Sequence, residues 1–348
     1  ENRVNGVSAT RRQSRLIETH VWNKLATTLS NLTLFLLPGS STSTFRLSQL
    51  VRTTNNFSDK NKLGCSSFGN VYKGQMDDGL EVAVKRISSS CTTRGIEFRN
   101  EVQILMKLHH KNIVKLLGYC VQQGEMILVY EHIHNKCLDK LIFADKMETP
   151  LDWSIRFRII KGIAQGIMYL HYQCGTPIIH GDVKPSNILL DSCLNPVIAN
   201  FGFSKQVIPG AEPEDSGIIS GTMGYIDPEF FYTGKNSTEC DVYSFGVVLI
   251  EIIAGKRNYV HPPEECRSDK SILICHVSPH ARELWTAGRA LEIIDPSLHS
   301  EDNMTEILRF IQIGLLCIQL KDRPSMVDVF LMLCCENASV PAPKEATY

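Results

Sequence analysis

One segment, residues 180–202, limits what this chain can fold into more than any other. It reads His180-Gly181-Asp182-Val183-Lys184-Pro185-Ser186-Asn187, continues through a strand-like run, and ends in Asn200-Phe201-Gly202. A carboxylate (Asp182), an ammonium group (Lys184) and amide oxygens (Asn187, Asn200) are groups that can take a proton, contact a phosphate and bind a hard cation. The alternative interpretation is a polar loop between two buried strands, and motifs elsewhere in the chain weigh against it.

Upstream, a segment with two glycines precedes a strand that carries a lysine. The segment is Leu63-Gly64-Cys65-Ser66-Ser67-Phe68-Gly69-Asn70-Val71, and the strand is Glu81-Val82-Ala83-Val84-Lys85-Arg86-Ile87. Glycines let backbone amides approach phosphates closely, although a hairpin turn explains such a segment about as well when it stands alone. A lysine in an apolar strand is usually a solvated edge residue. The two features together indicate that Lys85 contacts phosphate.

A helix and a buried strand follow. Phe98, Val102 and Leu105 recur at helical spacing, which predicts a helix over 94–109 that also contains Glu101. In an arbitrary helix, such a glutamate would usually lie on a solvated face. The run 126–131 is apolar and predicts a buried strand.

Taken in this order, the motifs resemble those of a eukaryotic protein kinase. That signature is H-R-D-L-x-x-x-N followed by D-F-G, with a G-x-G-x-x-G-x-V loop and a V-A-I-K strand upstream. Three departures from it bear on the chemistry: Gly181 replaces the Arg, Asn200 replaces the metal-binding Asp, and Ser66 replaces the middle glycine.

Residues 45–340 are similar to the cytoplasmic kinase domain of plant receptor-like kinases, most of all the S-domain and cysteine-rich receptor kinases. The entry segment and the end of the activation segment carry this similarity: Phe45-Arg46-Leu47-Ser48-Gln49-Leu50, Thr54-Asn55-Asn56-Phe57-Ser58, Gly221-Thr222-Met223-Gly224-Tyr225 and Asp227-Pro228-Glu229. Lys184 and Thr222 favour a Ser/Thr kinase over a Tyr kinase.

The resemblance implies roles for individual residues. Asp182 would accept the proton of the attacking hydroxyl, Lys184 would reach the transferring phosphate, and Asn187 would complete the catalytic set. ATP would be the cofactor, with Mg²⁺ held weakly by Asn187 and Asn200, because an amide lacks the charge of the replaced carboxylate. The implied nucleotide-binding residues, among which Tyr130 is the gatekeeper, are Leu63, Gly64, Gly69, Val71, Ala83, Lys85, Glu101, Tyr130, Glu131, Ile133 and Leu189.

By resemblance, Glu101 would pair with Lys85, and two further pairings are expected around the activation segment. Asp241 would begin an apolar, buried helix and either cap it or tether the catalytic loop. Arg323 would pair with Glu229 by resemblance, since a buried carboxylate needs a partner.

The expected fold is α+β and bilobal, as in protein kinases. The small N-lobe, at about 57–130, would be a twisted antiparallel sheet with one key helix. The larger C-lobe, at about 135–336, would be mainly helical, with one long helix over 153–172. The kinase domain would span 45–340, preceded by a flexible juxtamembrane-like extension (1–44) and followed by a tail (341–348).

Composition narrows the function classes and the compartment. The net charge is −1 and the pI is near 6.9, so electrostatics give no case for nucleic-acid binding. The 12 cysteines are scattered without C-x-x-C pairs, which favours reduced cytosolic thiols over a disulfide framework or a zinc site.

The apolar run within 25–37 is too short and polar to span a bilayer. The chain starts at Glu1 and not at Met, which suits either a fragment or a processed product. If it is a fragment, it would be associated with the membrane only through a missing N-terminal transmembrane part. It would then lie on the cytoplasmic side of the plasma membrane as part of a receptor, and in the cytosol if it is complete.

Two functional hypotheses remain open. The first is a Ser/Thr kinase that transfers the γ-phosphate of ATP to protein substrates, with activity weakened by Asn200. The second is a pseudokinase that binds nucleotide and acts as a signalling scaffold. In either case the expected partners are protein substrates or signalling proteins, a co-receptor kinase among them.

Overall fold

A computed structural model of the chain describes residues 43–66, 69–87, 92–144, 151–207, 219–258, 277–298 and 301–344. It divides into two compact units. The first comprises the residues up to 106 together with Lys115–His132, and the second comprises Lys107–Val114 and the residues from 133 onward. Each unit is described separately below.

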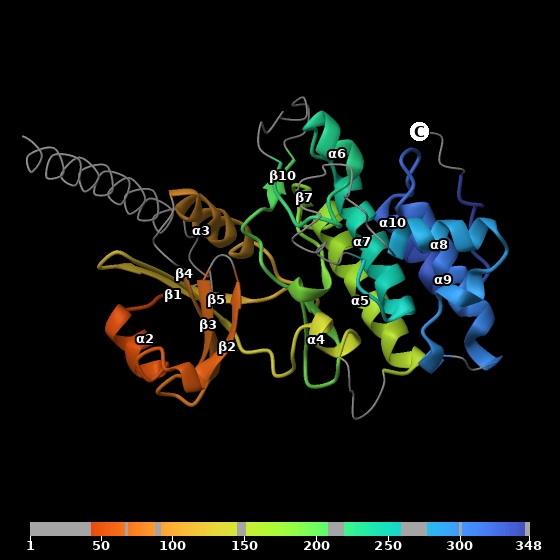
Figure 1. Ribbon diagram of the computed structural model, residues 1–348. Coiled ribbons are helices and arrows are strands. Elements are labelled where there is room, and N and C mark those ends of the chain that lie inside the picture. Colours follow the sequence, from red (N-terminus) through yellow and green to blue (C-terminus); the bar gives the residue numbers. More distant parts are fainter. Residues whose placement is uncertain are drawn as a thin grey trace, which may run out of the picture. The chain divides into compact units, whose positions relative to one another are not determined.

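The first unit is built on a six-stranded sheet, with strand order β1-β5-β6-β4-β3-β2 (Figure 1). Its strands are β1 (Ser43–Thr44), β2 (Lys62–Ser66), β3 (Gly69–Gln75), β4 (Glu81–Ile87), β5 (Leu116–Gln122) and β6 (Glu125–Glu131). Neighbouring strands are antiparallel, as expected, except that β1 pairs with β5 in parallel. The short helices of this unit are α2 (Leu47–Thr53) and η1 (Asp59–Asn61), and the long one is α3 (Thr92–Leu105).

The two faces of this sheet differ because side chains alternate along each strand. Val82 and Val84 of β4 are fully buried in a cluster that also contains Leu50 of α2, Ile127 and Val129. Ala83, between them on β4, and Lys85 therefore point to the opposite face. This alternation places the apolar cluster on one face of β4 and Ala83 and Lys85 on the other.

Helix α3 buries the predicted apolar stripe but ends earlier than expected. Phe98, Val102 and Leu105 are all buried. The helix ends at Leu105, whereas the sequence predicted that it would continue to 109. The reason is that 107–114 belongs to the second unit, where the amide of Val114 donates to the carbonyl of Ile198 (2.9 Å).

The first described residues, Ser43 and Thr44, pair with β5, although the sequence assigned them to the flexible extension. Gly118 of β5 makes this approach possible. A Cβ atom at Gly118 would lie 2.0 Å from the carbonyl oxygen of Ser43 and 2.5 Å from the Phe45 ring. The rest of the predicted extension, 1–42, lies outside the described residues.

The second unit is mainly helical, as the sequence predicted. Its α-helices are α4 (Leu138–Ile142), α5 (Trp153–Tyr172), α6 (Pro228–Thr233), α7 (Thr238–Ala254), α8 (Val277–Thr286), α9 (Met304–Cys317) and α10 (Met326–Cys334). Its 3₁₀ helices are η2 (Pro185–Asn187), η4 (Ala290–Ile293), η5 (Pro296–Leu298) and η6 (Glu301–Asn303). Short antiparallel pairs join β7 (Ile178–Ile179) with β10 (Lys205–Gln206) and β8 (Ile188–Leu190) with β9 (Pro196–Ile198).

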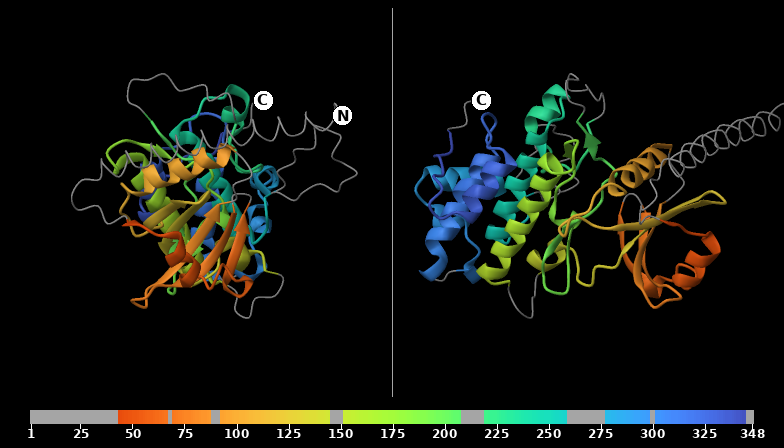
Figure 2. Two further views of the ribbon diagram at one scale, coloured as in Figure 1. Left: turned by 90° about the vertical axis from the view of Figure 1, so that its left-hand side faces the viewer. Right: turned by 180° about the vertical axis from the view of Figure 1, so that it is seen from behind.

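Helices α5 and α7 form the centre of this unit. Figures 1 and 2 show them side by side, with α9 and α10 packed beyond them. Helix α5 has the predicted bounds, and Asp152 caps its first turn by accepting from the amide of Ile155 (2.8 Å). Helix α7 begins at Thr238 with Ser237 as its cap, so the expectation that Asp241 begins this helix was wrong.

Arg323 has a different partner from the one expected. Its guanidinium binds both carboxylate oxygens of Asp227, at 2.6 and 2.7 Å, and both side chains are buried. Glu229, the expected partner, is exposed. Asp227 is buried at the N-cap of α6, where a carboxylate needs a charged donor, and this explains why it takes the arginine.

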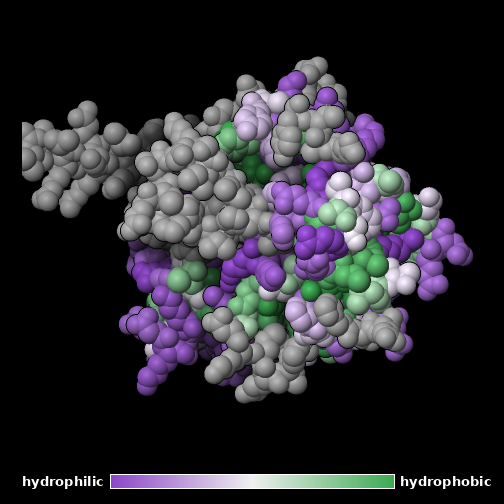
Figure 3. Space-filling view, turned by 45° about the vertical axis from the view of Figure 1, so that its right-hand side comes forward, coloured by the Kyte–Doolittle hydropathy of each residue, from purple (hydrophilic) through white to green (hydrophobic). Residues whose placement is uncertain are grey.

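The described surface mixes polar and apolar side chains. Figure 3 shows hydrophobic residues reaching one face of the molecule in places between hydrophilic ones. Tyr232 of α6 is 84% exposed and Phe231 beside it is 37% exposed. Among the helices that the structure describes, none has the length and hydropathy needed to cross a membrane.

Candidate active site

In the first unit, the predicted nucleotide-binding residues gather on one face of the sheet. Val71 pairs with Lys85 across β3 and β4, and Ala83 pairs with Tyr130 across β4 and β6. Residues directly opposite each other in antiparallel strands share a face, so these four side chains lie on the face that the apolar cluster leaves open. Val71 and Ala83 are partly exposed there. The sequence prediction that they act together is thus consistent with the register.

Lys85 forms the predicted ion pair with Glu101. Its Nζ lies 2.8 Å from Glu101 Oε2, and both side chains are buried. Tyr130 donates its hydroxyl to the other oxygen of the same carboxylate, Oε1, at 2.7 Å. Burial and the adjacent carboxylate raise the pKa of Tyr130 well above its usual range, so this phenol stays protonated and remains a donor. The pair is therefore held from two sides.

The glycine-containing segment forms β2 and the start of β3, and its turn at 67–68 lies outside the described residues. Leu63 is 50% exposed, and Gly64 has open space where a side chain would lie. At Gly69, a Cβ atom would lie 2.1 Å from the carbonyl oxygen of Arg86, so only glycine fits against β4. Lack of a side chain is therefore required for sheet packing at Gly69.

Three predicted nucleotide contacts remain: Glu131 and Ile133, where the chain leaves the first unit, and Leu189, in the second unit. Glu131 ends β6 and is exposed, and Ile133 is the first residue of the second unit in this stretch. Leu189 lies in β8, partly buried and bridged to Cys137. Their common contact with a nucleotide remains a prediction.

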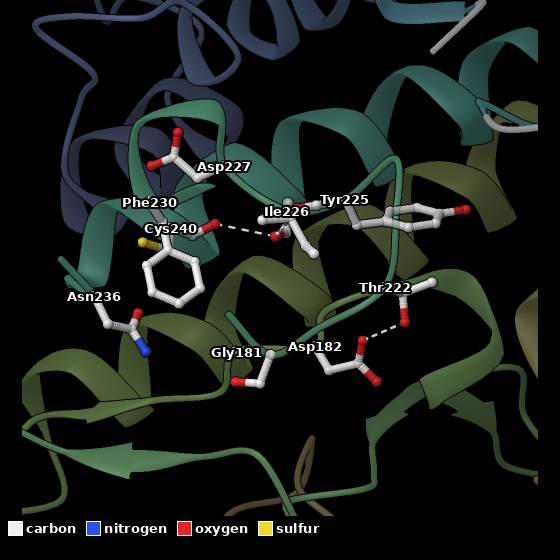
Figure 4. A pocket seen from close by; sticks show the side chains of 11 residues that line it. Gly181, Asp182, Thr222, Tyr225, Ile226, Asp227, Phe230, Asn236 and Cys240 are labelled. Atoms are coloured by element: carbon white, nitrogen blue, oxygen red, sulfur yellow. Dashed lines mark hydrogen bonds between the residues drawn. The ribbon is translucent and has the colours of Figure 1, made fainter. Parts of the chain in front are cut away.

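In the second unit, the predicted catalytic residues surround the carboxylate of Asp182. Lys184 Nζ lies 2.9 Å from Asp182 Oδ2, and Asn187 donates to the same oxygen (2.7 Å) and to the Asp182 carbonyl (2.8 Å). Thr222 donates its hydroxyl to Asp182 Oδ1 at 2.6 Å, as Figure 4 shows, and accepts from Lys184 at 2.5 Å. These contacts fix the orientation of a buried carboxylate that can accept a proton.

The backbone that presents Asp182 is tethered to α7. The amides of His180 and Gly181 donate to Asp241 Oδ2 (2.7 Å) and Oδ1 (2.9 Å), and His171 Nε2 lies 2.9 Å from Oδ2. Burial alone would raise the pKa of Asp241, but His171, the charge of His180 and the Gly181 amide hold it below its usual value. Of the two roles expected for Asp241, the structure shows the tether.

Gly181 has a left-handed backbone, with φ of +76°. A Cβ atom there would lie 3.2 Å from the carbonyl oxygen of Phe203. Glycine adopts this conformation without the strain that a side chain brings. The departure from the signature therefore relaxes the backbone next to the catalytic carboxylate.

The implied metal site contains two amides and no carboxylate beyond Asp182. Asn200 Nδ2 lies 3.4 Å from Asp182 Oδ2 and 3.4 Å from Asn187 Oδ1, so an N–H group faces the two oxygens. Mg²⁺ requires oxygen ligands, with charged oxygens preferred. As oriented here, the amides form a hydrogen-bonded network, and this position offers fewer charged oxygens than Mg²⁺ prefers.

A pocket opens beside the catalytic carboxylate (Figure 4). It is lined by Gly181, Asp182, Ser220, Thr222, Tyr225, Ile226, Asp227, Phe230, Asn236, Cys240 and Ser244. The thiol of Cys240 is buried, which raises its pKa to about 12 and keeps it protonated and unreactive. The pocket lining therefore contains two carboxylates, that of Asp182 and that of Asp227, which is paired with Arg323, among apolar and neutral groups.

Two connections in the site were missed by sequence reasoning. Thr222 entered that reasoning only as a sign of Ser/Thr specificity, whereas it binds Asp182 and Lys184 directly. Tyr130 was assigned to the nucleotide pocket, and its hydrogen bond to Glu101 was not foreseen. The G-T-x-G-Y run was the available signal for Thr222. No local pattern points from Tyr130 to a helix residue.

Comparison with known proteins agrees with this arrangement. Residues 57–332 match the protein kinase domain family. From Arabidopsis thaliana, cysteine-rich receptor-like protein kinase 10 is 42% identical over 84% of this chain and 43% of its own length, and cysteine-rich receptor-like protein kinase 25 is 40% identical over 94% and 48%. A G-type lectin S-receptor-like serine/threonine-protein kinase is 42% identical over 87% of this chain and 36% of its own length.

The chain spans less than half the length of these relatives. The family match covers both units and includes Lys85, Asp182 and Asn200. The expected kinase fold is confirmed, and kinases in general use ATP and a divalent metal. The chain belongs to the protein kinase family, and its relatives are plant receptor-like kinases of the Ser/Thr type.

Proposed function

We propose that this chain binds ATP and transfers its γ-phosphate to serine and threonine hydroxyls of proteins, at a rate lowered by Asn200. The observation that supports this most is the set of contacts on Asp182, where Lys184, Asn187 and Thr222 hold one buried carboxylate in place. The formed ion pair between Lys85 and Glu101 is a second, separate support.

The proposed chemistry assigns one task to each group. Asp182 accepts the proton of the attacking hydroxyl, because its Oδ1 already accepts from the Thr222 hydroxyl and an acceptor hydroxyl presents the same chemistry. Lys184 neutralises charge on the transferring phosphate, and Lys85 binds the nucleotide phosphates. Glu101 and Tyr130 orient Lys85 and do not react.

The pocket beside Asp182 is the proposed place for the protein segment that carries the hydroxyl. Its wall includes Thr222, Tyr225 and Ile226, which are neutral and leave room beside the carboxylate (Figure 4). An acidic side chain on the segment suits this lining poorly, because it would lie beside the carboxylates of Asp182 and Asp227.

The second candidate function is a pseudokinase that binds nucleotide and signals by docking partners. Asn200 favours it, because loss of about 4 kcal/mol of metal-derived stabilisation would slow transfer roughly a thousandfold. The two candidates share Lys85, Glu101 and the nucleotide pocket. They differ only in whether the chemical step proceeds.

A phosphotransfer assay separates the candidates. The purified chain is incubated with labelled ATP, Mg²⁺ and a general protein substrate, beside the Asp182→Asn and Lys85→Met variants. Label on serine and threonine that both variants abolish supports the kinase. ATP binding without transfer above the Asp182→Asn level supports the scaffold. Absence of both contradicts the proposed function.

The proposal extends to the cellular setting. We infer a domain on the cytoplasmic side of the plasma membrane, within a receptor whose partners include protein substrates and a co-receptor kinase. The support is that the relatives are named receptor-like kinases and are more than twice as long as the matched region. Imaging of the tagged gene product and identification of co-purifying kinases test this; a nuclear or soluble product without them contradicts it.

A further inference from the structure

Asn258, just beyond the C-terminal end of α7, is fully buried and hydrogen-bonds three separate parts of the second unit. Its side-chain Nδ2 donates to the carbonyl of Gly224 at 2.7 Å. Its Oδ1 accepts from the amide and from the hydroxyl of Ser278 in α8, at 3.0 Å each. Its backbone amide donates to Glu251 Oε1 of α7 at 2.7 Å. Asn258 therefore joins the activation segment, α7 and α8 at one point.

The carbonyl that Asn258 holds belongs to a turn. The amide of Tyr225 donates to the carbonyl of Thr222 at 3.0 Å, which closes a four-residue turn over 222–225. Two contacts with α7 fix the end of this turn. The Tyr225 hydroxyl donates to Glu251 at 2.9 Å, and Ser244 donates to the Tyr225 carbonyl at 2.6 Å. The second half of the turn is thus bound to its surroundings by its backbone and by a side chain.

The first residue of the same turn carries the hydroxyl that contacts the catalytic carboxylate. Thr222 donates to Asp182 Oδ1 at 2.6 Å and accepts from Lys184 Nζ at 2.5 Å. Figure 4 shows Thr222 and Tyr225 on one stretch of backbone, with the Thr222 hydroxyl directed at Asp182. Asn258 holds the turn two residues from Thr222, so it acts on Asp182 through the backbone of the turn.

The link is specific because its polar groups are buried. Gly224 is buried and Ser278 is 3% exposed. The amide of Ser278 belongs to the first turn of α8, where N–H groups have no partner within the helix. Without the Asn258 side chain, this amide and the Gly224 carbonyl would each lose a partner, which is costly for buried groups. They could regain partners only if the turn or the start of α8 moved.

We propose that Asn258 is a positioning residue for phosphotransfer, which keeps the Thr222 hydroxyl on Asp182 by holding the turn against α8. The task given to Asp182 rests on the proposed function, whereas the link between Asn258 and Thr222 is a property of the fold. The position of α8 then contributes to the orientation of the catalytic carboxylate.

The first test is a double-mutant cycle that needs no activity. Urea unfolding is measured for the purified wild-type chain, Asn258→Ala, Thr222→Val and the double variant. Asn258→Ala is expected to raise the unfolding equilibrium constant by about tenfold or more, because it leaves buried groups unpaired. In the Thr222→Val background this increase is expected to be smaller by at least about threefold, since residues coupled through a shared backbone shift are not additive.

Two further variants keep this test decisive. Asn112→Ala is the matched control, because the buried Nδ2 of Asn112 donates to a backbone carbonyl outside the turn, that of Pro196, at 2.8 Å. Its effect on unfolding is expected to be the same with and without Thr222→Val. If Asn258→Ala does not fold, Ser278→Ala takes its place. It removes one donor to Asn258 Oδ1 and is expected to show the same coupling at a smaller size.

The second test uses the phosphotransfer assay, in the wild-type and in the Asn200→Asp background. Asn258→Ala is expected to lower kcat by about tenfold or more and to change the KM for ATP by less than about twofold. Thr222→Val is expected to abolish this effect of Asn258→Ala, because the contact that Asn258 positions is then already lost.

The outcomes separate this inference from the proposed function. Additive effects of Asn258→Ala and Thr222→Val on unfolding overturn the inference, whatever the activity. A kcat that Asn258→Ala lowers equally with and without Thr222→Val overturns the positioning role and leaves the kinase function intact. Coupling in unfolding without phosphotransfer in either background contradicts the kinase function, while it supports the link between Asn258 and Thr222.

Discussion

Tyr130 donates a hydrogen bond to Glu101 Oε1 at 2.7 Å, while Oε2 of the same carboxylate holds Lys85 Nζ at 2.8 Å. The buried glutamate is thus shared between a lysine of β4 and a tyrosine of β6. A buried charge that loses a donor is costly. The orientation of Lys85 therefore depends on a phenol as well as on the ion pair.

Tyr130→Phe is accordingly expected to lower the free energy of unfolding by about 2 kcal/mol, as for loss of a buried hydrogen bond to a charged group. ATP affinity is expected to fall as well, because Lys85 is held less firmly. Urea unfolding and calorimetric titration measure the two effects. Tyr72→Phe, in the same sheet, removes a hydroxyl that does not contact Glu101. Equal losses in both variants would argue against the proposed role of Tyr130.

The buried pair between Arg323 and Asp227 predicts that mutation of Asp227 destabilises the chain far more than mutation of the nearby Glu229. Asp227→Asn is expected to destabilise the chain by about 3–5 kcal/mol, because it leaves the buried guanidinium without a counter-charge. Glu229→Gln, which alters an exposed carboxylate, is expected to cost less than about 0.5 kcal/mol. Thermal and chemical unfolding of the two variants measure this difference. The reverse order of stabilities would restore the pairing that the sequence predicted.

The sequence could predict the features that depend on local patterns. The motifs around Lys85, Asp182 and Trp153 are local patterns, so the strand, the catalytic loop and helix α5 were predicted with nearly correct bounds. The resemblance to protein kinases also predicted the pair between Lys85 and Glu101, which the structure shows.

The partner of Arg323 and the pairing of β1 depend on long-range contacts that no local pattern encodes. The carboxylates of Asp227 and Glu229 are two residues apart, and only the burial of Asp227 at the N-cap of α6 decides which one needs a counter-charge. The link between Thr222 and Asp182 depends in the same way on how the chain folds back between them. Such choices are set by tertiary packing, which local sequence patterns do not contain.

A buried carboxylate near the activation segment predicts a pH dependence. Glu251 of α7 accepts from the Tyr225 hydroxyl (2.9 Å) and the Asn258 amide (2.7 Å), and its Oε2 is buried without a hydrogen bond. Burial raises its pKa from 4.5 to about 7, an effect that nearby Arg257 reduces and Asp139 adds to.

The sign follows from this upward shift. Glu251 ionises near pH 4.5 in the unfolded chain and near pH 7 in the folded chain. Its contribution to the free energy of unfolding is therefore fully present below about pH 4.5 and is lost as the pH rises to 7. The loss is of the order of 3 kcal/mol. Glu251→Gln is expected to remove this part of the pH dependence, as measured by urea unfolding between these pH values. Glu283→Gln, at an exposed position, is the control and is expected to keep it. A pH dependence that Glu251→Gln leaves unchanged contradicts the assignment.

The glycine at position 181 leads to a prediction about phosphorylation of the activation segment. Where an arginine occupies this position, it commonly pairs with a phosphorylated residue of that segment; glycine has no such side chain. Phosphorylation at Ser220, or at Ser216 outside the described residues, is therefore not expected to be the main activating switch through this contact.

Comparison of Ser216→Ala/Ser220→Ala with wild type measures this in the phosphotransfer assay. Gly181→Arg should cost about 1 kcal/mol or more, because φ of +76° strains a residue with a Cβ atom. A large loss of activity in the double alanine variant, which Gly181→Arg changes in a phosphorylation-dependent way, would refute the prediction.

The last prediction concerns the chemical step. Asn200→Asp restores the carboxylate while Asp182, Lys184 and Lys85 stay in place, so autophosphorylation in Mg²⁺ is expected to rise by roughly two to four orders of magnitude, at tenfold per 1.36 kcal/mol. Asn200→Asp combined with Asp182→Asn is expected to be inactive, because no base remains for the hydroxyl proton. Initial rates at saturating ATP measure both. A wild-type rate equal to that of Asn200→Asp would mean that the amide does not limit transfer. If neither form transfers phosphate, the defect lies elsewhere, first at Ser66, and the scaffold function gains support.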